Sequence, residues 1–286
     1  MAILAKEGIP ISHSCRVLGF SRSGFYDWKK RPAAVVNADE FALRAKAKQL
    51  FKESRASLGS RGLMRALNSE GFTVGRYKVR KIMQSHGLKV HQRVAYKVTT
   101  QRDTSAKAAP NRVKMAFNPN EPNRVWAGDI TYLRTAEGWC YLSVVMDLYS
   151  RRIIGWSLDK RMTTHLVERS LQQAYWLRKR PKNVIFHSDR GSQYTSESFR
   201  NLASKLGIKQ SMGDTGTCWD NAVVERFFGS LKHDWLLKAH HPTRDDMKKD
   251  VAAYMHYYNL KRLHTANENM SPVNYENYRL KVSESS

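Results

Sequence analysis

The sequence has few cysteines, and they are poorly placed for bonding or for binding metal. Cys15, Cys140 and Cys218 are far apart and form neither a C-x-x-C pair nor a disulfide framework. This is typical of a protein in a reducing cytoplasm. The ten histidines also lack the paired spacing of a zinc module. We therefore expect no disulfide and no structural zinc.

Long apolar runs are missing as well. None approaches the roughly 18–20 residues that a membrane span needs. The first residues, 1–6, lack the apolar core and cleavage site of a signal peptide. A hydrophobic content of 41% over 286 residues is enough for one sizeable core and one or two small modules. We expect a cytoplasmic protein with no membrane partner.

Acidic residues are scarce relative to basic ones. The chain has 49 Lys and Arg against 25 Asp and Glu, a net charge of +24. Residues 1–122 hold 24 of the basic residues and only 8 of the acidic ones. An excess this large indicates a polyanionic partner, and nucleic acid is the commonest. The first half is the predicted docking surface, and the second half contains most of the acids.

Two helical modules are predicted in the first half. Residues 9–31 have the pattern of a helix-turn-helix, with Gly19 in the turn and Ser21 capping the second helix, although a plain helical hairpin has the same pattern. Residues 38–90 predict three more helices, whose inward side chains include Phe41. The third, from Arg76 to His86, has the shape of a major-groove helix, and a solvated basic face is the alternative. Its outward cations, the candidate DNA contacts, are Arg76, Lys78, Arg80 and Lys81.

After a linker with little periodicity, the pattern changes to strands at residue 123. Strands are predicted at 125–133, 140–147, 153–158, 184–187 and 208–212. Helices are predicted at 163–178 and 197–206, around Glu225 from 219 to 237, and at 245–260, followed by a tail. Three strands in hairpin order, then alternating helices and strands, is the order of the ribonuclease H-like fold. The fold class is therefore α/β, with small all-α modules before it.

Three acids stand out in this second half. Asp129 interrupts an apolar strand, Asp189 ends another, and Glu225 lies in an amphipathic segment 35 residues further on. A buried carboxylate without a partner costs several kcal/mol or becomes neutral. Three of them favour a shared metal site. Mg²⁺ prefers carboxylate and water oxygens, so a set of only Asp and Glu fits it.

The residues around these acids resemble those of a known family. Residues 126–132 (WAGDITY) resemble the first-aspartate motif of bacterial insertion-sequence transposases related to retroviral integrases. Residues 187–194 (HSDRGSQY) resemble the second motif, and Asp220-Asn221-Ala222 with Glu225 and Lys232 resembles the glutamate motif. The match is closest to the catalytic OrfB protein of the insertion-sequence-three family, and it spans residues 58–278.

The resemblance implies a DNA transposase with a ribonuclease H-like integrase catalytic core. Asp129, Asp189 and Glu225 would be its catalytic and metal-binding residues, holding two Mg²⁺ ions, for which Mn²⁺ can substitute. The reaction would be DNA cleavage followed by attack of the freed 3′-hydroxyl on another phosphodiester. Expected partners are element ends and target DNA, a second copy on DNA, and the upstream-frame OrfA product. The expected location is the bacterial cytoplasm, on the nucleoid.

Neighbouring residues are candidates for DNA contacts. On a helix, Asn221 and Lys232 would project to the side of Glu225. Arg190 and Gln193 follow Asp189, while Gly191 permits a tight turn. His187 is either a substrate-orienting residue or a satisfied strand-end histidine. Three rival carboxylates are Asp147, Asp214 and Asp220, and structural roles are favoured for Asp147 and Asp220.

The predicted domains are a helix-turn-helix segment at 1–35, a helical DNA-binding module at 36–92 and a basic linker at 93–122. The catalytic core follows at 123–238, and a C-terminal helix and tail at 239–286. Two other functions remain open: a transposase-derived DNA-binding or regulatory protein without catalysis, and a metal nuclease of the same fold. Intact acids at all three positions argue against a pure binding protein.

Overall fold

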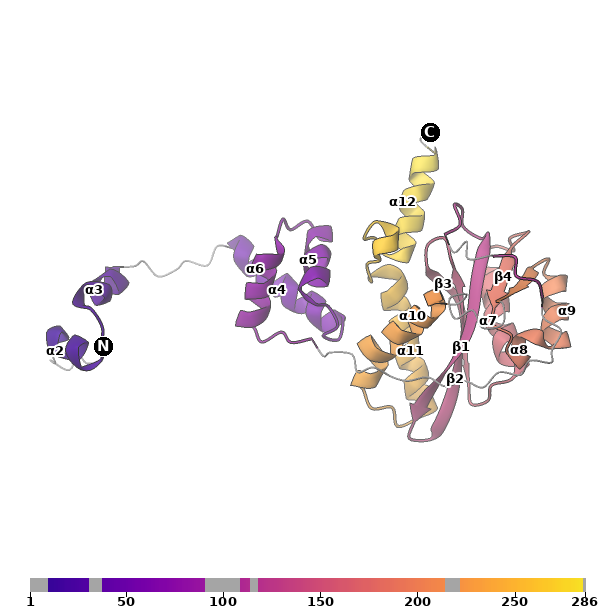
Figure 1. Ribbon diagram of the computed structural model, residues 1–286, viewed down its shortest axis with the longest axis horizontal. Helices are drawn as coiled ribbons and strands as arrows, with labels where there is room; N and C mark the ends of the chain where they lie inside the picture. The colour runs from indigo at the N-terminus through magenta and orange to yellow at the C-terminus, as the bar shows by residue number, and fades with distance from the viewer. Residues whose placement is uncertain (1–9, 31–37, 91–108, 114–117, 214–221, 285–286) are drawn as a thin grey trace. The chain divides into compact units, whose positions relative to one another are not determined.

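The computed structural model describes residues 10–30, 38–90, 109–113, 118–213 and 222–284. The chain divides into two compact units, Met1–Lys46 and Ala47–Ser286, and each is described by itself (Figure 1). Within the described ranges, no helix is both long and apolar enough to cross a membrane.

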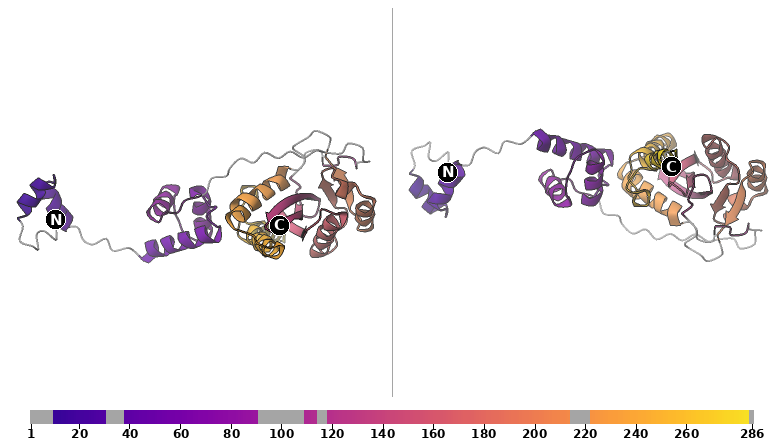
Figure 2. Two further views of the ribbon diagram at one scale, coloured as in Figure 1. Left: turned by 90° about the horizontal axis from the view of Figure 1, so that it is seen from below. Right: turned by 90° about the horizontal axis from the view of Figure 1, so that it is seen from above.

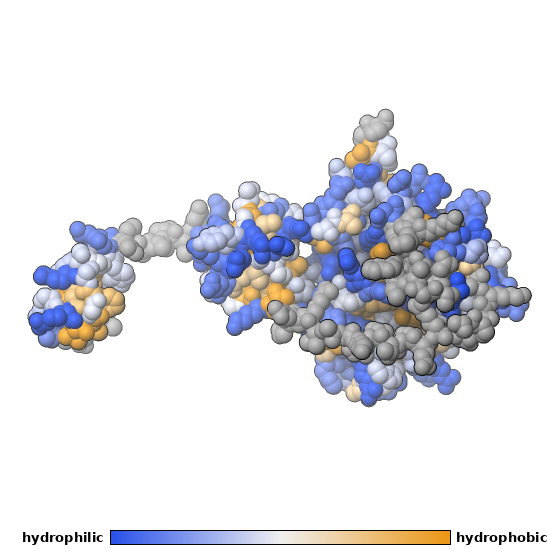
Figure 3. Space-filling view, viewed as in Figure 1, coloured by the Kyte–Doolittle hydropathy of each residue, from blue (hydrophilic) through white to orange (hydrophobic). Residues whose placement is uncertain are grey.

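The first unit begins with two short helices, α2 (Ile11–Val17) and α3 (Arg22–Lys30). Gly19 makes the turn between them with a positive φ of 69°. The hydroxyl of Ser21 accepts a hydrogen bond from the backbone N–H of Gly24 at 3.0 Å, which confirms the predicted cap. Several apolar side chains stay exposed on this pair, among them Val17 and Phe20 (Figure 3).

The next three helices confirm the predicted module. They are α4 (Ala38–Glu53), which crosses the boundary between the units, α5 (Ser60–Ser69) and α6 (Arg76–Ser85). α5 packs against α6, and their buried side chains are Leu63, Leu67, Val79 and Ile82. The prediction for Phe41 was wrong, because its side chain is 69% exposed. The buried row of α4 is Leu43, Ala47 and Phe51 at four-residue spacing, and Phe41 lies outside that row.

The catalytic-core prediction of a mixed five-stranded sheet is confirmed. Its strands are β1 (Val125–Thr135), β2 (Gly138–Asp147), β3 (Arg152–Asp159), β4 (Ile185–Ser188) and β5 (Lys209–Met212). Their order is β3-β2-β1-β4-β5. β1, β2 and β3 are antiparallel neighbours, whereas β4 runs parallel to β1, and β5 parallel to β4. Only the first residues of β1 pair with β4, so the carboxyl end of β4 lies beside the middle of the central strand, at the kind of edge where an α/β sheet commonly carries its site.

Helices cover both faces of this sheet (Figures 1 and 2). α7 (Thr164–Leu177), α8 (Ser192–Thr195) and α9 (Glu197–Lys205) lie on one face, and α10 (Ala222–Ser230) and α11 (Arg244–Leu260) on the other. Each face has its own buried apolar cluster. A Cβ at Gly155 of β3 would lie 2.1 Å from the carbonyl oxygen of Ser170, so α7 packs directly on the strand backbone.

The helix that carries Glu225 is shorter than predicted. α10 ends at Ser230 and continues as a π-helical turn, η1 (Leu231–Trp235), and a 3₁₀ turn, η2 (Leu236–Lys238). Arg262 donates hydrogen bonds to Ser230 Oγ at 3.1 Å and to Asp234 Oδ2 at 3.3 Å, so it holds both ends of the π turn. π turns inside helices are frequent at functional sites.

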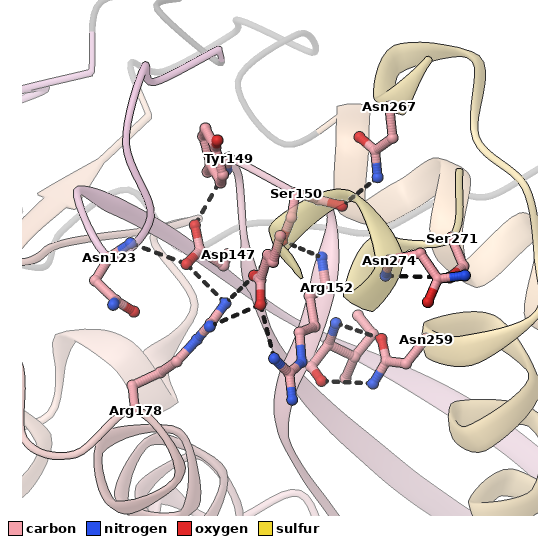
Figure 4. A network of polar contacts seen from close by, with 12 residues as sticks. Asn123, Asp147, Tyr149, Ser150, Arg152, Arg178, Asn259, Asn267, Ser271 and Asn274 are labelled. Atoms are coloured by element: carbon pink, nitrogen blue, oxygen red, sulfur yellow. Dashed lines mark hydrogen bonds and ion pairs between the residues drawn. The ribbon is translucent and has the colours of Figure 1, made fainter. Parts of the chain in front are cut away.

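The C-terminal tail also differs from the prediction, because it contains a helix, α12 (Pro272–Glu284), after a 3₁₀ turn, η3 (Thr265–Asn267). Glu276 of α12 is buried and accepts hydrogen bonds from Arg178, Arg152 and Ser150 of the core. Figure 4 shows the network around Asp147 and Arg178 to which this carboxylate belongs. Tertiary ion pairing therefore fixes a helix that has almost no amphipathic pattern of its own.

Part of the predicted linker lies against the core. In the segment 109–113, the backbone N–H of Arg112 donates to Ser211 Oγ at 2.9 Å, and Val113 is buried in the cluster on the α10 face. The other described part is 118–122, while residues 93–108 and 114–117 lie outside the described residues.

Candidate active site at the ends of β1 and β4

Asp129 lies in the central strand just beyond its pairing with β4. That pairing joins Val125–Ala127 of β1 to Ile185–His187 of β4. The Asp129 carboxylate is half-buried, and its Oδ1 accepts a hydrogen bond from the backbone N–H of Ile130 at 2.8 Å. Asp129 pairs with Val144 of β2, and like other strand side chains it points to one face of the sheet.

Asp189 follows the last residue of β4 and is half-buried as well. Its Oδ1 accepts a hydrogen bond from the backbone N–H of Gly191 at 3.0 Å. A Cβ at Gly191 would lie 3.0 Å from that same oxygen, which is tighter than an ordinary contact. Glycine therefore lets the chain turn closely around this carboxylate before α8 begins.

The phenol of Tyr194 places the two aspartates near one another. Tyr194 is fully buried in α8, and burial raises the pKa of its phenol well above the usual range. The negative charges of Asp129 and Asp189 raise this pKa further. The pKa of this one hydroxyl therefore depends on the charges of both carboxylates. Sequence reasoning gave Tyr194 no role, although it ends the second of the three motifs.

Lys232 brings a positive charge to the same place. Burial lowers the pKa of its ammonium, and the negative charge of Asp129 opposes part of that shift. Its Nζ lies 4.6 Å from the centroid of the Tyr132 ring. The predicted reason for its position was an α-helical offset of seven from Glu225, but Lys232 lies in the π turn.

Glu225 is exposed in the first turn of α10, a helix that packs against β1. Across the described residues, no three or more His, Cys, Asp or Glu side chains come together closely enough to hold a metal ion. The structure thus brings together Asp129, Asp189 and Lys232, but does not place Glu225 in a ligand cluster with the aspartates. Asn221, Asp214 and Asp220 lie outside the described residues.

Asp147 and His187 have structural partners. Asp147 accepts hydrogen bonds from the backbone N–H groups of Asn123 at 2.9 Å and Tyr149 at 3.1 Å, and from Arg178 at 3.0 Å (Figure 4). Burial raises its pKa, and the charge of Arg178 opposes part of that shift. His187 is buried, with its Nδ1 3.0 Å from Ser211 Oγ. The favoured structural role of Asp147 fits these contacts, and the role of His187 stays open between its two alternatives.

The candidate DNA contacts near Asp189 are held by the backbone. Arg190 Nε donates to the carbonyl oxygen of Gly213 at 2.9 Å, and Gln193 Nε2 donates to that of Met162 at 3.2 Å. On α6, the four cations are exposed as predicted, and Lys81 Nζ lies 4.7 Å from the Tyr77 ring centroid. These four are Arg76, Lys78, Arg80 and Lys81.

Family models match most of the chain. Two models described as "Integrase core domain" match residues 119–218 and 206–272, and an "HTH-like domain" model matches residues 38–96. The first two cover the sheet and the helices around it, and the third covers α4, α5 and α6.

Curated relatives match at higher identity than solved structures. The "Transposase InsF for insertion sequence IS3A" of Escherichia coli (strain K12) is 37% identical over 94% of this chain and 95% of its own length. The "Insertion element IS600 uncharacterized 31 kDa protein" of Shigella sonnei is 34% identical over 91% of this chain and 96% of its own.

Among solved structures, the HTLV-2 integrase catalytic core domain in complex with magnesium is 20% identical, with a TM-score of 0.43, and covers 55% of this chain and 97% of that one. The simian T-cell lymphotropic virus intasome is 20% identical, with a TM-score of 0.45, and covers 76% of this chain and 70% of that one. The identity and coverage of the curated relatives decide the assignment. The chain belongs to the family of IS3-type InsF transposases, with an integrase core and an HTH-like domain.

Proposed function

We infer that this protein is a DNA transposase that cleaves the ends of its own mobile element and joins the freed 3′-hydroxyl to a second phosphodiester. The observation that supports this inference is that Asp129 and Asp189 come from the neighbouring parallel strands β1 and β4, just beyond their pairing, and that both charges raise the pKa of Tyr194. Two half-buried carboxylates on neighbouring strands would suit a cation.

The donor set suits a divalent cation of the magnesium type. Asp129 and Asp189 would hold it, with Glu225 completing the set, because α10 packs against the strand that carries Asp129. Mg²⁺, or Mn²⁺ in its place, supplies positive charge to the attacking and leaving oxygens of a phosphoryl transfer. The carboxylate-only chemistry of these three residues fits hard cations better than zinc.

The remaining residues position DNA. Lys232, whose pKa is lowered by burial and partly raised by the charge of Asp129, would contact a phosphate beside the reacting group. Arg190, Gln193 and Asn221 would contact the strand near Asp189. On the HTH-like domain, α6 presents Arg76, Lys78, Arg80 and Lys81 to the duplex, since all four are exposed. A second copy of the chain and the OrfA product would act on the same DNA.

A joining assay tests this function. Purified protein is incubated with labelled DNA ends of its own element in Mg²⁺ or Mn²⁺, and joined products are resolved on a gel. We expect joining by the unaltered chain and its loss in Glu225→Gln. Glu197→Gln is the matched control, because Glu197 is also an exposed glutamate in the first turn of a helix.

Each alternative has a distinct outcome in the same assay. Joining that survives Glu225→Gln would refute the proposed site. Cleavage without joining would identify a hydrolytic nuclease of the same fold. Retention of DNA without cleavage would identify a binding or regulatory protein derived from a transposase.

A further inference from the structure

The β1–β2 hairpin carries aromatic and cationic side chains that no part of the proposed reaction uses. The strand register pairs Tyr132 with Tyr141 and Arg134 with Trp139. Directly opposed and alternate residues share one face of a strand pair, so these four side chains lie together. We call these four residues, with Lys232, the hairpin platform.

The two rings at its centre are open to solvent. Tyr132 is 38% exposed and Trp139 is 42% exposed, and their rings meet edge to face with centroids 5.3 Å apart. Trp126 and Tyr254, by contrast, are fully buried in the same core. Burying a large ring is among the stronger contributions to folding, so a pair of rings kept at the surface is typical of a binding site.

Cations lie against both rings. Lys232 Nζ is 4.6 Å from the Tyr132 centroid, and Arg134 Cζ is 5.0 Å from the Trp139 centroid. Aromatic faces next to positive charges are what proteins use for single-stranded nucleic acid, since rings stack on bases while cations attract phosphates. The chemistry of the platform therefore matches a nucleotide rather than an apolar peptide.

The hairpin is held in place from α11. Arg244 Nη2 donates to the carbonyl oxygen of Glu137 at 2.7 Å, and its Nε donates to that of Trp139 at 3.3 Å. The backbone N–H of Ala136 donates to the carbonyl oxygen of His241 at 3.0 Å. These bonds fix the turn, so little ordering is needed when a ligand stacks on it.

The platform is also continuous with the candidate active site. Tyr132 follows Asp129 by three residues on β1, and Lys232 lies close both to the Tyr132 ring and to the charge of Asp129. Tyr132 and Asp129 are three residues apart and so lie on opposite faces of β1, and Lys232 is the residue that links the platform to the Asp129 site.

We propose that Tyr132 and Trp139 stack on an unpaired base of the DNA strand held at the Asp129 site. The proposal rests on the proposed function, because it needs DNA at that site. In a duplex the faces of each base are covered by its neighbours, whereas an unpaired base offers a free face. Stacking accepts any base, so the platform would select a frayed or single-stranded end and not a sequence.

The test is a binding measurement in EDTA with the full-length protein. Two DNAs are compared: a duplex of the element end with a short unpaired 3′ tail, and the same duplex with a blunt end. The tail carries 2-aminopurine, whose fluorescence is quenched on stacking. We expect Trp139→Ala to weaken tailed binding about 5- to 150-fold and to leave blunt binding unchanged. The quenching should also disappear.

Trp176→Ala is the matched control. Trp176 is 58% exposed on α7, and Arg180 lies over its ring at 4.1 Å, so it repeats the tryptophan–arginine pair away from the hairpin. This variant should keep the preference for the tail. Trp139→Phe, which retains an aromatic face, should keep most of it, and Tyr132→Leu should lose part of it.

Two results would overturn the proposal. In the first, Trp139→Ala keeps both the preference for the tail and the quenching. In the second, Trp139→Ala weakens binding of the blunt and the tailed DNA equally, which would mean that the platform contacts the backbone of the duplex. Should Trp139→Ala fail to fold, an unquenched tail with the unaltered protein would overturn it equally. Joining in Mg²⁺ is measured in parallel. If the unaltered protein prefers the tailed DNA but joins no DNA, the transposase function is refuted and the platform is not. If it joins DNA but shows no preference for the tail, the platform is refuted and the transposase function is not.

Discussion

Two pairs of carboxylates in this core differ in their surroundings. Asp147 ends β2 with its side chain 0% exposed, and it shares the guanidinium of Arg178 with Glu276. Asp129 and Asp189 are half-buried, and they accept hydrogen bonds from the backbone amides of Ile130 and Gly191. The first pair shares an arginine inside the protein, while the second is the pair proposed to bind a cation. Partners, not residue type, separate a structural acid from a candidate catalytic one.

The comparison predicts the strongest effect on activity at the second pair. Asp189→Asn should lower joining by about 10³-fold, because a bound cation contributes several kcal/mol to the transition state. Its Tm should stay within about 2 °C of the unaltered protein, since the carboxylate is half-buried. Asp147→Asn is the contrasting variant and should lower Tm by more. If Asp189→Asn and Asp147→Asn lower Tm equally, the two pairs do not differ in their structural role.

The strongest effect on stability is expected at the first pair. Arg178→Met should lower the free energy of unfolding by about 3–5 kcal/mol, because it leaves Asp147 and Glu276 buried without their shared cation. Urea denaturation measures this change. Arg180→Met is the control, because Arg180 is exposed on the same segment and should change stability by less than about 0.5 kcal/mol.

Arg262 differs from both pairs, because it is half-buried and holds the turn that carries Lys232. Arg262→Met should lower the free energy of unfolding by about 1.5–3 kcal/mol, the range for hydrogen bonds to charged groups. It should also reduce joining, since the π turn is no longer held at both ends. Lys261→Met, an exposed neighbour, is the control. Unchanged joining in a folded Arg262→Met would show that the turn does not position Lys232.

Lowering the pH should remove the stability that Glu276 of the first pair contributes. Burial acts to raise the pKa of Glu276, but the hydrogen bond and charge of Arg178 outweigh it, so this pKa lies below its ordinary 4.5. Its contribution to stability is present above pH 4.5 and is lost as pH falls through the folded value. The pKa of Asp147 is raised instead, so the contribution of Asp147 to stability increases as pH falls. Urea midpoints measured below pH 4.5 should therefore fall less steeply in Glu276→Gln than in the unaltered chain; an identical slope would contradict this account.

The smallest effect is expected on α6, where the exposed cations are proposed to bind DNA and should contribute little to stability. Lys78→Ala and Lys81→Ala should each reduce the slope of log affinity for DNA against log salt by about 1. Lys248→Ala, an exposed lysine of α11, is the control and should leave the slope unchanged. If the slope of log affinity against log salt is the same in all three variants, α6 does not contact the DNA.

Regular elements of the core were predictable because their patterns are strong. β1, β2 and α7 lie within a few residues of their predicted bounds, since strands rich in Val, Ile, Trp and Tyr and a helix with one apolar face are strong patterns. α12 was missed because its stability comes from Glu276 and not from amphipathicity. The π turn after Ser230 was missed because an α-helical offset was assumed throughout. The domain boundaries and the role of each site residue stay predictions.

The sequence by itself determined the order of strands and helices, the three acids with their spacing, and the basic surface of α6, because local periodicity and charge are properties of the chain alone. Only the tertiary structure decided which acids have arginine partners. Arg178 reaches Asp147 from 31 residues away and Glu276 from 98, and no local pattern encodes such contacts. The same holds for Tyr194 between the two aspartates and for Lys232 over Tyr132. Electrostatic partners depend on distance in space, which the sequence specifies only through the fold.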